Sequence, residues 1–156
     1  IAGRLLELSK TGRGEHFDEI CDIITEYNNN TGIYFSLESL RNFANNGRVN
    51  PAIAKITGML GIRLVGNAGN NGTLTPTDKC RGEKKAIATL YKNMKEKGYA
   101  GGTVVIDQCF NEGGANALKS LIAAEFPNAN VRIEKTSGLC SFYAEKGGLM
   151  IGFERG

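Results

Sequence analysis

The sequence contains no tryptophan, three prolines and a single histidine, His16. A nucleophilic Ser–His or Cys–His site would therefore depend on His16, which precedes a helix expected to be exposed to solvent. The four cysteines show no Cys-x-x-Cys spacing, and one histidine adds little to a possible metal site. We therefore expect buried, reduced thiols, with no catalytic residues, no metal and no cofactor.

Long apolar runs and concentrated charge are also missing. No stretch approaches the roughly 20 apolar residues that cross a bilayer, and no charged-then-apolar leader opens the sequence. We therefore expect no membrane span and a cytoplasmic location. The formal net charge is +3, but Lys and Arg do not form the stripe that is typical of nucleic-acid-binding proteins. Nucleic-acid binding is not predicted.

What is present predicts an α/β fold with a mixed β-sheet and flanking helices. Alternating apolar residues predict a half-buried strand over 33–37. The turn signal Asn71-Gly72 predicts a hairpin of strands 62–65 and 73–79, and Pro76 places the second strand at a sheet edge or bulge. The apolar run within 103–109 predicts a central strand covered on both faces. Further strands are expected around 131–133 and 149–153, and helices around 39–44, 51–60, 83–97 and 118–126.

The first 30 residues predict two helices and no strand. Leu5 and Leu8 recur at helical spacing, and a second apolar stripe comprises Phe17, Ile20, Ile24 and Tyr27. The sequence also opens on Ile1 inside the first helical pattern, so we expect a fragment of a longer protein. Residues 1–30 are then predicted to belong to a preceding domain, and residues 31–156 to form the α/β domain.

Three features leave the chemistry open. The cations Lys79, Arg81, Lys84 and Lys85 crowd a helix start, where the helix dipole disfavours positive charge, so they indicate either an anion or partner contact or a solvated face. Gly113-Gly114 follows a strand and precedes a helix, which a tight turn or an anion site explains. Asp107 lies in an apolar strand, either as a loop cap or as a functional carboxylate.

Four stretches, in the same order and with similar spacing, resemble the DegV family. Residues 32–40 followed by Asn46-Gly47-Arg48-Val49 are similar to its strand, short helix and Gly-Gly-Arg-Ile signature. Leu60-Gly61-Ile62-Arg63-Leu64 resembles its Leu-Asn-Ile-Lys-Pro strand. Residues 79–86 resemble its Val-Arg-Gly-x-Lys-Lys-Ala run, and residues 140–153 resemble its closing segment.

The resemblance implies the C-terminal, lid-forming part of a fatty-acid carrier that is not itself an enzyme. It implies a long-chain fatty acid as ligand, an ATP-dependent fatty acid kinase as partner, and contact with the N-terminal domain of the same protein. Where the family's closing segment usually has His, this sequence has Tyr143, which stays neutral near pH 7. The expected apolar wall comprises Phe35, Leu37, Ile53, Ile56, Met59, Leu60 and Leu64. The expected polar contacts are Arg48, Arg81 and Tyr143.

Two readings remain beside the carrier. One is a small α/β enzyme or sensor that binds a phosphorylated metabolite through Arg81, Lys84 and the Gly113-Gly114 helix entrance. The other is a regulatory interaction module, indicated by the basic cluster and by the lack of a recognisable catalytic motif.

Overall fold

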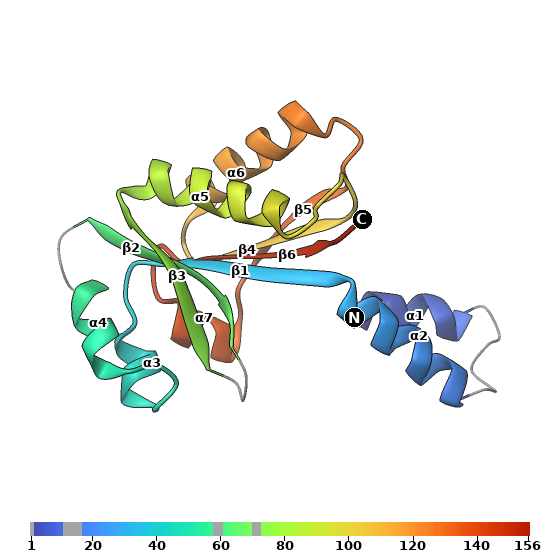
Figure 1. Cartoon of the computed structure of the whole chain (residues 1–156), viewed down its shortest axis with the longest axis horizontal. Helices are drawn as coiled ribbons and strands as arrows, with labels where there is room; N and C mark the ends of the chain where they lie inside the picture. Colours follow the sequence, from blue (N-terminus) through green and yellow to red (C-terminus); the bar gives the residue numbers. More distant parts are fainter. Residues whose placement is uncertain (1, 11–16, 58–60, 70–72) are drawn as a thin grey trace. The chain divides into compact units, whose positions relative to one another are not determined.

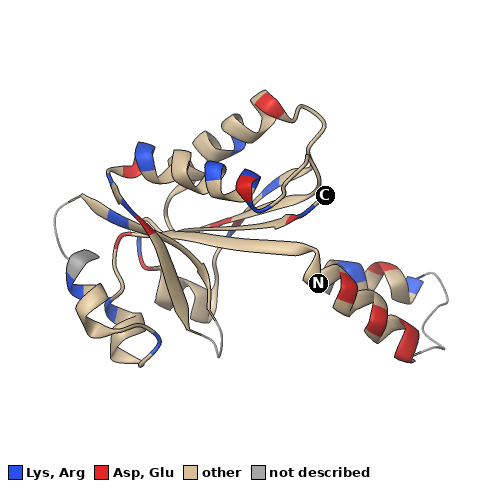
Figure 2. Cartoon of the chain, viewed as in Figure 1, with Lys and Arg blue, Asp and Glu red and all other residues tan. Residues whose placement is uncertain are grey.

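The computed structural model describes residues 2–10, 17–57, 61–69 and 73–156. The chain divides into two compact units, Ile1–Thr31 and Gly32–Gly156. The first unit contains helices α1 (Ala2–Lys10) and α2 (Phe17–Asn29), which contact each other. Acidic residues, shown in red in Figure 2, are prominent on α2, where Asp18 and Glu19 occupy the first turn. Carboxylates at that end favour the helix dipole.

The apolar stripe predicted for the first unit is only partly buried. Leu8 is buried, whereas Leu5 is 42% and Phe17 75% exposed. Ile20, Ile24 and Tyr27 are half-buried, and no described residue of α2 is fully buried. The helical spacing was therefore correct, but burial of Phe17 was wrong. His16 lies outside the described residues.

The second unit is built on a six-stranded mixed sheet in the order β3-β2-β1-β6-β4-β5 (Figure 1). Strands β1–β2, β2–β3 and β4–β6 pair antiparallel, while β4 and β5 pair parallel. The strands are β1 (Thr31–Leu37), β2 (Ile62–Ala68), β3 (Leu74–Arg81), β4 (Val104–Gln108), β5 (Val131–Lys135) and β6 (Leu149–Glu154). The helices of this unit are α3 (Arg41–Asn45), α4 (Pro51–Thr57), α5 (Glu83–Glu96), α6 (Glu112–Glu125) and α7 (Gly138–Ala144). The predicted mixed α/β fold is confirmed.

Pro76 lies on the edge strand β3, as predicted from its missing N–H. The ladder between β2 and β3 shifts register between Val65 and Gly66, and Gly66 pairs with Pro76. The bulge thus accommodates the residue that cannot donate to the ladder. The Asn71-Gly72 turn lies outside the described residues, although the antiparallel pairing of the two strands agrees with a hairpin.

Helices cover the two faces of the sheet unequally. Helices α5 and α6 lie on one face, and the larger core between them and the sheet includes Leu90, Ile106, Leu118 and Ile151. Helices α3, α4 and α7 lie on the other side (Figure 1). A smaller core there comprises Phe35, Leu37, Leu40, Val49 and Leu64. Because successive side chains of a strand point to opposite faces, Tyr34 packs in the first core and Phe35 in the second.

One burial prediction was wrong in this unit. Strand β4 is central, but Val105 and Asp107 are only half-buried, so it is fully covered on one face alone. An apolar run of three residues does not distinguish complete from one-sided cover. In α6, Leu118 and Ile122 are buried, whereas Leu121 is 39% exposed.

Candidate functional site

An apolar pocket lies between the sheet and α7. Its volume is about 200 Å³. The sheet supplies side chains from β1, β3 and β6, and the opposite wall comes from α7 and from Phe43 of α3. The lining residues are Phe35, Leu37, Phe43, Leu74, Thr136, Leu139, Cys140, Tyr143, Ala144, Leu149 and Met150. Apart from Thr136 and the Tyr143 hydroxyl, this lining offers only apolar surface and one thiol, so the pocket suits a hydrocarbon.

The sheet wall follows from strand alternation and one glycine. Phe35 and Leu37 share a face of β1, and both are almost fully buried. The Phe35 ring lies against Gly66, where an added Cβ would be 2.7 Å from its Cζ. The same Cβ would lie closer still to the Thr75 carbonyl oxygen on the neighbouring strand β3, so glycine at position 66 lets both that backbone and the Phe35 ring pack closely.

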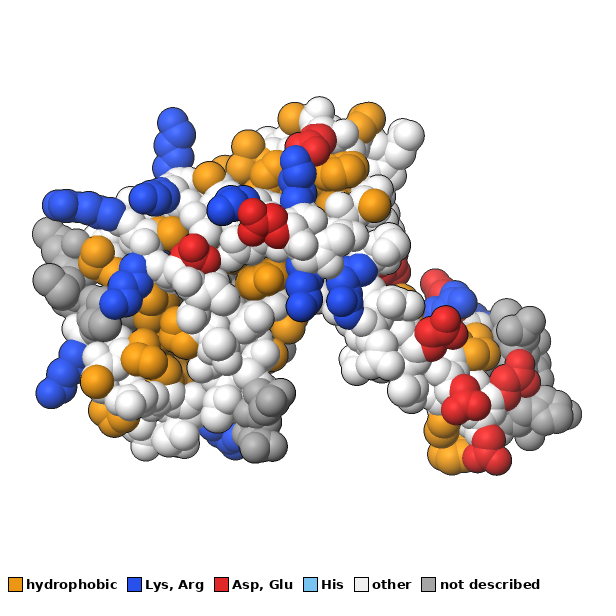
Figure 3. All heavy atoms as spheres, viewed as in Figure 1, with side chains coloured by type: hydrophobic (Ala, Val, Ile, Leu, Met, Phe, Trp, Pro, Cys, Tyr) orange, Lys and Arg blue, Asp and Glu red, His pale blue; other side chains and the backbone are white. Residues whose placement is uncertain are grey.

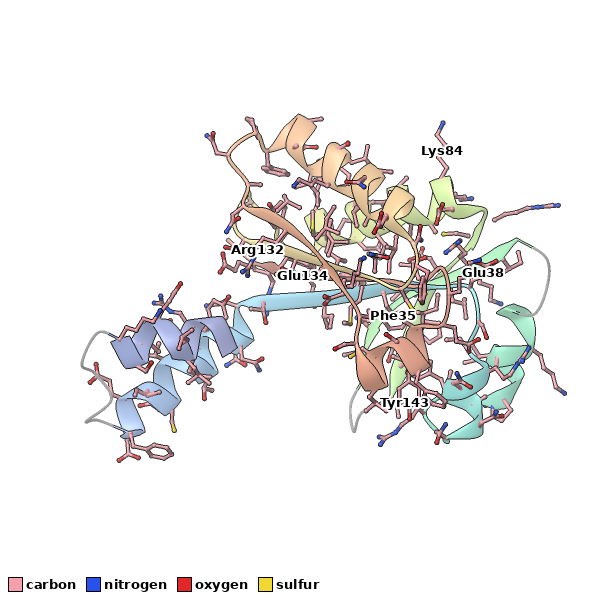
Figure 4. All side chains as sticks on the ribbon, turned by 180° about the vertical axis from the view of Figure 1, so that it is seen from behind. Phe35, Glu38, Lys84, Arg132, Glu134 and Tyr143 are labelled. Atoms are coloured by element: carbon pink, nitrogen blue, oxygen red, sulfur yellow. The ribbon has the colours of Figure 1, made fainter. Side chains whose placement is uncertain are left out.

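The helical wall is held by aromatic packing and one backbone contact. The rings of Phe43 and Tyr143 lie 4.5 Å apart, and Asn42 Nδ2 donates to the Phe142 carbonyl over 2.7 Å. Tyr143 comes from α7 and Phe35 from β1, and both lie on the same side of the sheet (Figure 4). Hydrophobic side chains also reach the surface on the side of α3 and α4 in Figure 3.

The segment between α7 and β6 is fixed by a charged network. The carbonyl of Gly147 accepts hydrogen bonds from Arg63 Nη1 at 2.8 Å and from Asn111 Nδ2 at 2.9 Å. Arg63 Nη2 lies 3.0 Å from Glu38 Oε2 and 3.2 Å from Glu83 Oε1. One guanidinium thus connects β2, the end of β1 and the start of α5 to this segment.

A second, more polar cavity of about 310 Å³ opens at the carboxyl ends of β4 and β5. Its lining is Gln108, Cys109, Phe110, Glu112, Lys135, Thr136 and Ser141. Lys135 Nζ lies 3.6 Å from Glu112 Oε1, and Ser141 Oγ donates to Thr136 Oγ1 over 2.9 Å. Thr136 lines both cavities, so they lie on either side of the strand-to-α7 connection.

Asp107 is a half-buried carboxylate on β4. Burial and the neighbouring charge of Glu134, its register partner on β5, raise the pKa of Asp107. Arg132 and Glu134 project from the same strand β5 (Figure 4). The loop after β4 is capped by Gln108 Oε1, which accepts from the Asn111 N–H, and by Asn111 Oδ1, which accepts from the Gly114 N–H. The expectation that Asp107 caps this loop was therefore wrong.

The structure brings together three of the predicted contact residues and separates the others. Phe35, Leu37 and Tyr143 line the apolar pocket. Leu64 is buried in the core behind it, and Ile53 is half-buried against that core. Arg48 and Arg81 are exposed and line neither cavity. Met59, Leu60 and the side chain of Ile56 lie outside the described residues.

The sequence analysis named Tyr143 but missed the helix that carries it and the other residues of the helical wall. No helix was expected over Gly138–Ala144, although four of its residues line the pocket. Phe43, Leu74, Leu149 and Met150 were also not proposed as lining residues. The sequence pattern that could have indicated this helix is the aromatic pair Phe142-Tyr143 between Gly138 and Gly147. That pattern does not show that the segment lines a pocket.

Within the described ranges, the structure contains neither a cluster of metal-binding side chains nor a helix that could span a membrane. No group of three or more potential metal-binding side chains occurs there. Each helix is too short or too polar to cross a bilayer. All four cysteines are free, with Cys80 and Cys109 buried but Cys21 and Cys140 exposed, so burial of all four thiols was wrong.

Comparison with known proteins decides the family. The family model described as "Uncharacterised protein, DegV family" matches residues 6–155. The chain belongs to the DegV family. A DegV domain-containing protein of Streptococcus pneumoniae is 42% identical over 142 residues, which are 91% of this chain and 50% of that protein. Another DegV domain-containing protein, from Streptococcus pyogenes, is 40% identical over 96% of this chain and 54% of its own length. The chain thus spans about half the length of these DegV relatives.

Two solved structures share the fold closely. The Streptococcus pneumoniae Fatty Acid Kinase (Fak) B3 protein, loaded with linoleic acid, superposes with a TM-score of 0.93 at 40% identity. A DegV family protein from Eubacterium eligens, loaded with heptadecanoic acid, gives 0.92 at 35% identity. Each match covers 99% of this chain, and 54% and 55% of the respective structures.

Proposed function

We propose that this chain is the acyl-chain-enclosing part of a fatty-acid carrier. The observation that carries the proposal is the apolar pocket of about 200 Å³ under α7, in a fold that two relatives use while loaded with fatty acids. An apolar cavity of about 150 Å³ holds one benzene molecule, so this pocket has room for about eight carbon atoms. At about 0.8 kcal/mol per buried methylene, their burial contributes about 6 kcal/mol before entropic costs.

Within this proposal the predicted residues have different roles. Phe35, Leu37 and Tyr143 contact the hydrocarbon directly, because they line the pocket. Leu64 and Ile53 support the wall from behind, since they pack in the core that includes Phe35. Ile56, Met59 and Leu60 stay predictions for the same wall.

The fatty-acid carboxylate requires polar groups from elsewhere in the protein. Most of the pocket lining is apolar, and a charged carboxylate buried there would remain largely unsolvated. We assign its recognition to an N-terminal domain of the same longer protein, to which residues 1–30 also belong. Residues 31–156 then form the lid over the acyl chain.

The carrier presents its fatty acid to a separate ATP-dependent fatty acid kinase and performs no catalysis itself. The kinase contact is assigned to the exposed cations Arg81, Lys79, Lys84 and Lys85, with Arg48 as a further candidate. Lys84 projects from the start of α5 away from the sheet (Figure 4), where a partner can reach it. Four free cysteines favour the cytoplasmic location that we predict.

Native mass spectrometry of the full-length protein tests the proposal. The protein is purified from lipid-replete cells and measured under conditions that retain non-covalent ligands. We expect an adduct with the mass of a long-chain fatty acid, which delipidation removes and added fatty acid restores. A ligand-free mass both before and after fatty acid is added would refute the carrier function.

A second candidate is an enzyme or sensor for a phosphorylated metabolite, favoured by the polar cavity at the carboxyl ends of β4 and β5. Lys135 and the start of α6 border this cavity, but Arg81 and Lys84 do not line it. Thermal-shift measurements distinguish the two functions. Phosphorylated metabolites raise Tm if the second candidate is correct, and long-chain fatty acids raise it if the carrier is correct.

A further inference from the structure

Arg63 lies where four separate parts of the second unit meet. Its guanidinium contacts Glu38 after β1, Glu83 at the start of α5 and the Gly147 carbonyl before β6. Asn111, which caps α6, donates to the same Gly147 carbonyl and to Glu83 Oε1 at 2.7 Å. Glu38 is labelled in Figure 4 at the end of β1.

The burial of Arg63 makes this arrangement costly to disturb. Its side chain is only 12% exposed, whereas Glu38 and Glu83 are 53% and 40% exposed. An arginine that has left water is stabilised by its carboxylate partners and by the carbonyl that it reaches. The planar guanidinium donates in several fixed directions at once, which a lysine ammonium on a flexible stem does less well.

The Gly147 carbonyl connects this cluster to the wall of the pocket. Gly147 follows α7 by three residues, and its N–H donates to the Cys109 carbonyl over 2.8 Å. Its φ of +92° and the φ of +51° at Glu145 show a tightly turned segment between α7 and β6. Four residues of α7 and the first two of β6 line the pocket, so the segment joins two parts of the same lining.

We propose that Arg63 is a positioning residue for the apolar pocket. It holds the Gly147 carbonyl together with Asn111, fixes the segment between α7 and β6, and thereby keeps α7 at the distance from β1 that encloses a hydrocarbon. Arg63 lines neither cavity, so it acts through α7 and not by touching the ligand. The inference rests on the proposed fatty-acid binding for its functional consequence, while its structural part concerns α7 alone.

The test compares Arg63→Met and Arg63→Lys in the full-length protein. A matched control is Lys95→Met, which breaks the 2.6 Å ion pair with Glu125 between α5 and α6 and lies outside both cavity linings. For each variant we measure Tm, the dissociation rate of a fluorescent long-chain fatty acid and amide hydrogen exchange over 139–148.

We expect Arg63→Met to raise the dissociation rate about tenfold, or about 1.4 kcal/mol, at the lower end for a hydrogen bond to a charged group. Amides of α7 exchange faster in this variant, and Arg63→Lys recovers part of both effects. The control lowers Tm but leaves the dissociation rate and the α7 amides unchanged. If Arg63→Met fails to fold, Arg63→Lys and Glu38→Gln are compared with the parent in the same three measurements, and smaller increases in the dissociation rate and in α7 exchange are expected.

Two results overturn the positioning role. One is an increase in the lipid dissociation rate of Lys95→Met as large as that of Arg63→Met, because the increase would then reflect a general loss of stability. The other is unchanged α7 exchange in the folded Arg63 variants, whatever the lipid data show. A parent protein that binds no fatty acid refutes the carrier function instead, and hydrogen exchange then still decides whether Arg63 fixes α7.

Discussion

Filling the apolar pocket with a phenyl ring should abolish most acyl-chain binding. Ala144 ends α7 and lines the pocket. On one side its methyl group faces Gly148, where an added Cβ would lie only 2.8 Å away. A larger side chain at position 144 therefore cannot turn toward Gly148. We expect the ring of Ala144→Phe to enter the pocket.

The size of the effect follows from the volume. A benzene-sized group needs a cavity of about 150 Å³, which is about three quarters of this pocket. The ring then displaces about six of about eight carbon atoms, and about 5 kcal/mol of burial is lost if the chain finds no other apolar surface. If a displaced chain recovers about half of that contact elsewhere, affinity falls by about 2.5 kcal/mol, or roughly 50- to 100-fold.

Equilibrium displacement of a fluorescent fatty acid from the full-length protein measures this change. Ala123→Phe is the control, because Ala123 is exposed on α6 and lines neither cavity. Circular dichroism and Tm report whether both variants fold. A folded Ala144→Phe protein that binds within threefold of the parent would show that the hydrocarbon lies elsewhere, and the assignment of this pocket would be wrong.

Three further predictions concern stability. Ser36 is buried, and no hydrogen-bond partner for its hydroxyl exists among the described residues. Ser36→Ala should therefore raise the free energy of unfolding, measured by urea denaturation, by about 1 kcal/mol. A lower free energy of unfolding in the variant would show that the hydroxyl has a hydrogen-bond partner. Burial and Glu134 raise the pKa of Asp107 above its usual 3.8, so its ionised form costs stability, and this cost disappears as the pH falls below both the folded and the unfolded pKa. Asp107→Asn should therefore stabilise the protein at pH 7 but not near pH 3.5, and an equal gain at both values contradicts the reasoning. Gly66→Ala should destabilise by about 1–3 kcal/mol in the same urea assay, because its methyl group would collide with the Thr75 carbonyl oxygen and with the Phe35 ring. Unchanged stability would show that both the β3 backbone and the ring can move aside.

The strands and the long helices were predictable because each is specified by its own residues. Helix α5 carries a periodic stripe that includes Ile87, Leu90 and Met94, and all three are buried as that spacing requires. Strand β6 alternates Leu149, Ile151 and Phe153 on one buried face. Such periodicity needs no knowledge of the partner surface.

Helix α7 was not predictable in the same way. Its sequence places Leu139 and Phe142 in largely exposed positions, and none of its residues is fully buried. A seven-residue helix with no buried stripe is marginal by itself, so contacts with α3 and the following segment must hold it in place. These contacts join residues about 100 positions apart, as between Asn42 and Phe142, and local patterns do not contain them.

The same limit explains why only two of the four described wall candidates, Phe35 and Leu37, line the pocket. Leu64 and Phe35 both read as inward-facing strand residues, and both are buried. Alternation cannot separate a side chain that fills the core from one that borders a cavity, because both leave water. What separates them is the surface opposite: Phe35 faces α7 across the pocket, whereas Leu64 packs within the core.

The volume of the pocket also constrains the proposed carrier function. Room for about eight carbon atoms encloses only part of a long-chain fatty acid. The remaining methylenes and the carboxylate must contact other surfaces, since exposed methylenes contribute no burial energy and a carboxylate is poorly stabilised beside apolar side chains. The proposed division, in which one part encloses hydrocarbon and another supplies polar contacts, agrees with a chain that spans about half of its relatives' length. Affinity then depends on how the two parts close around the ligand, which makes the fixed position of α7 as important as the side chains that it presents.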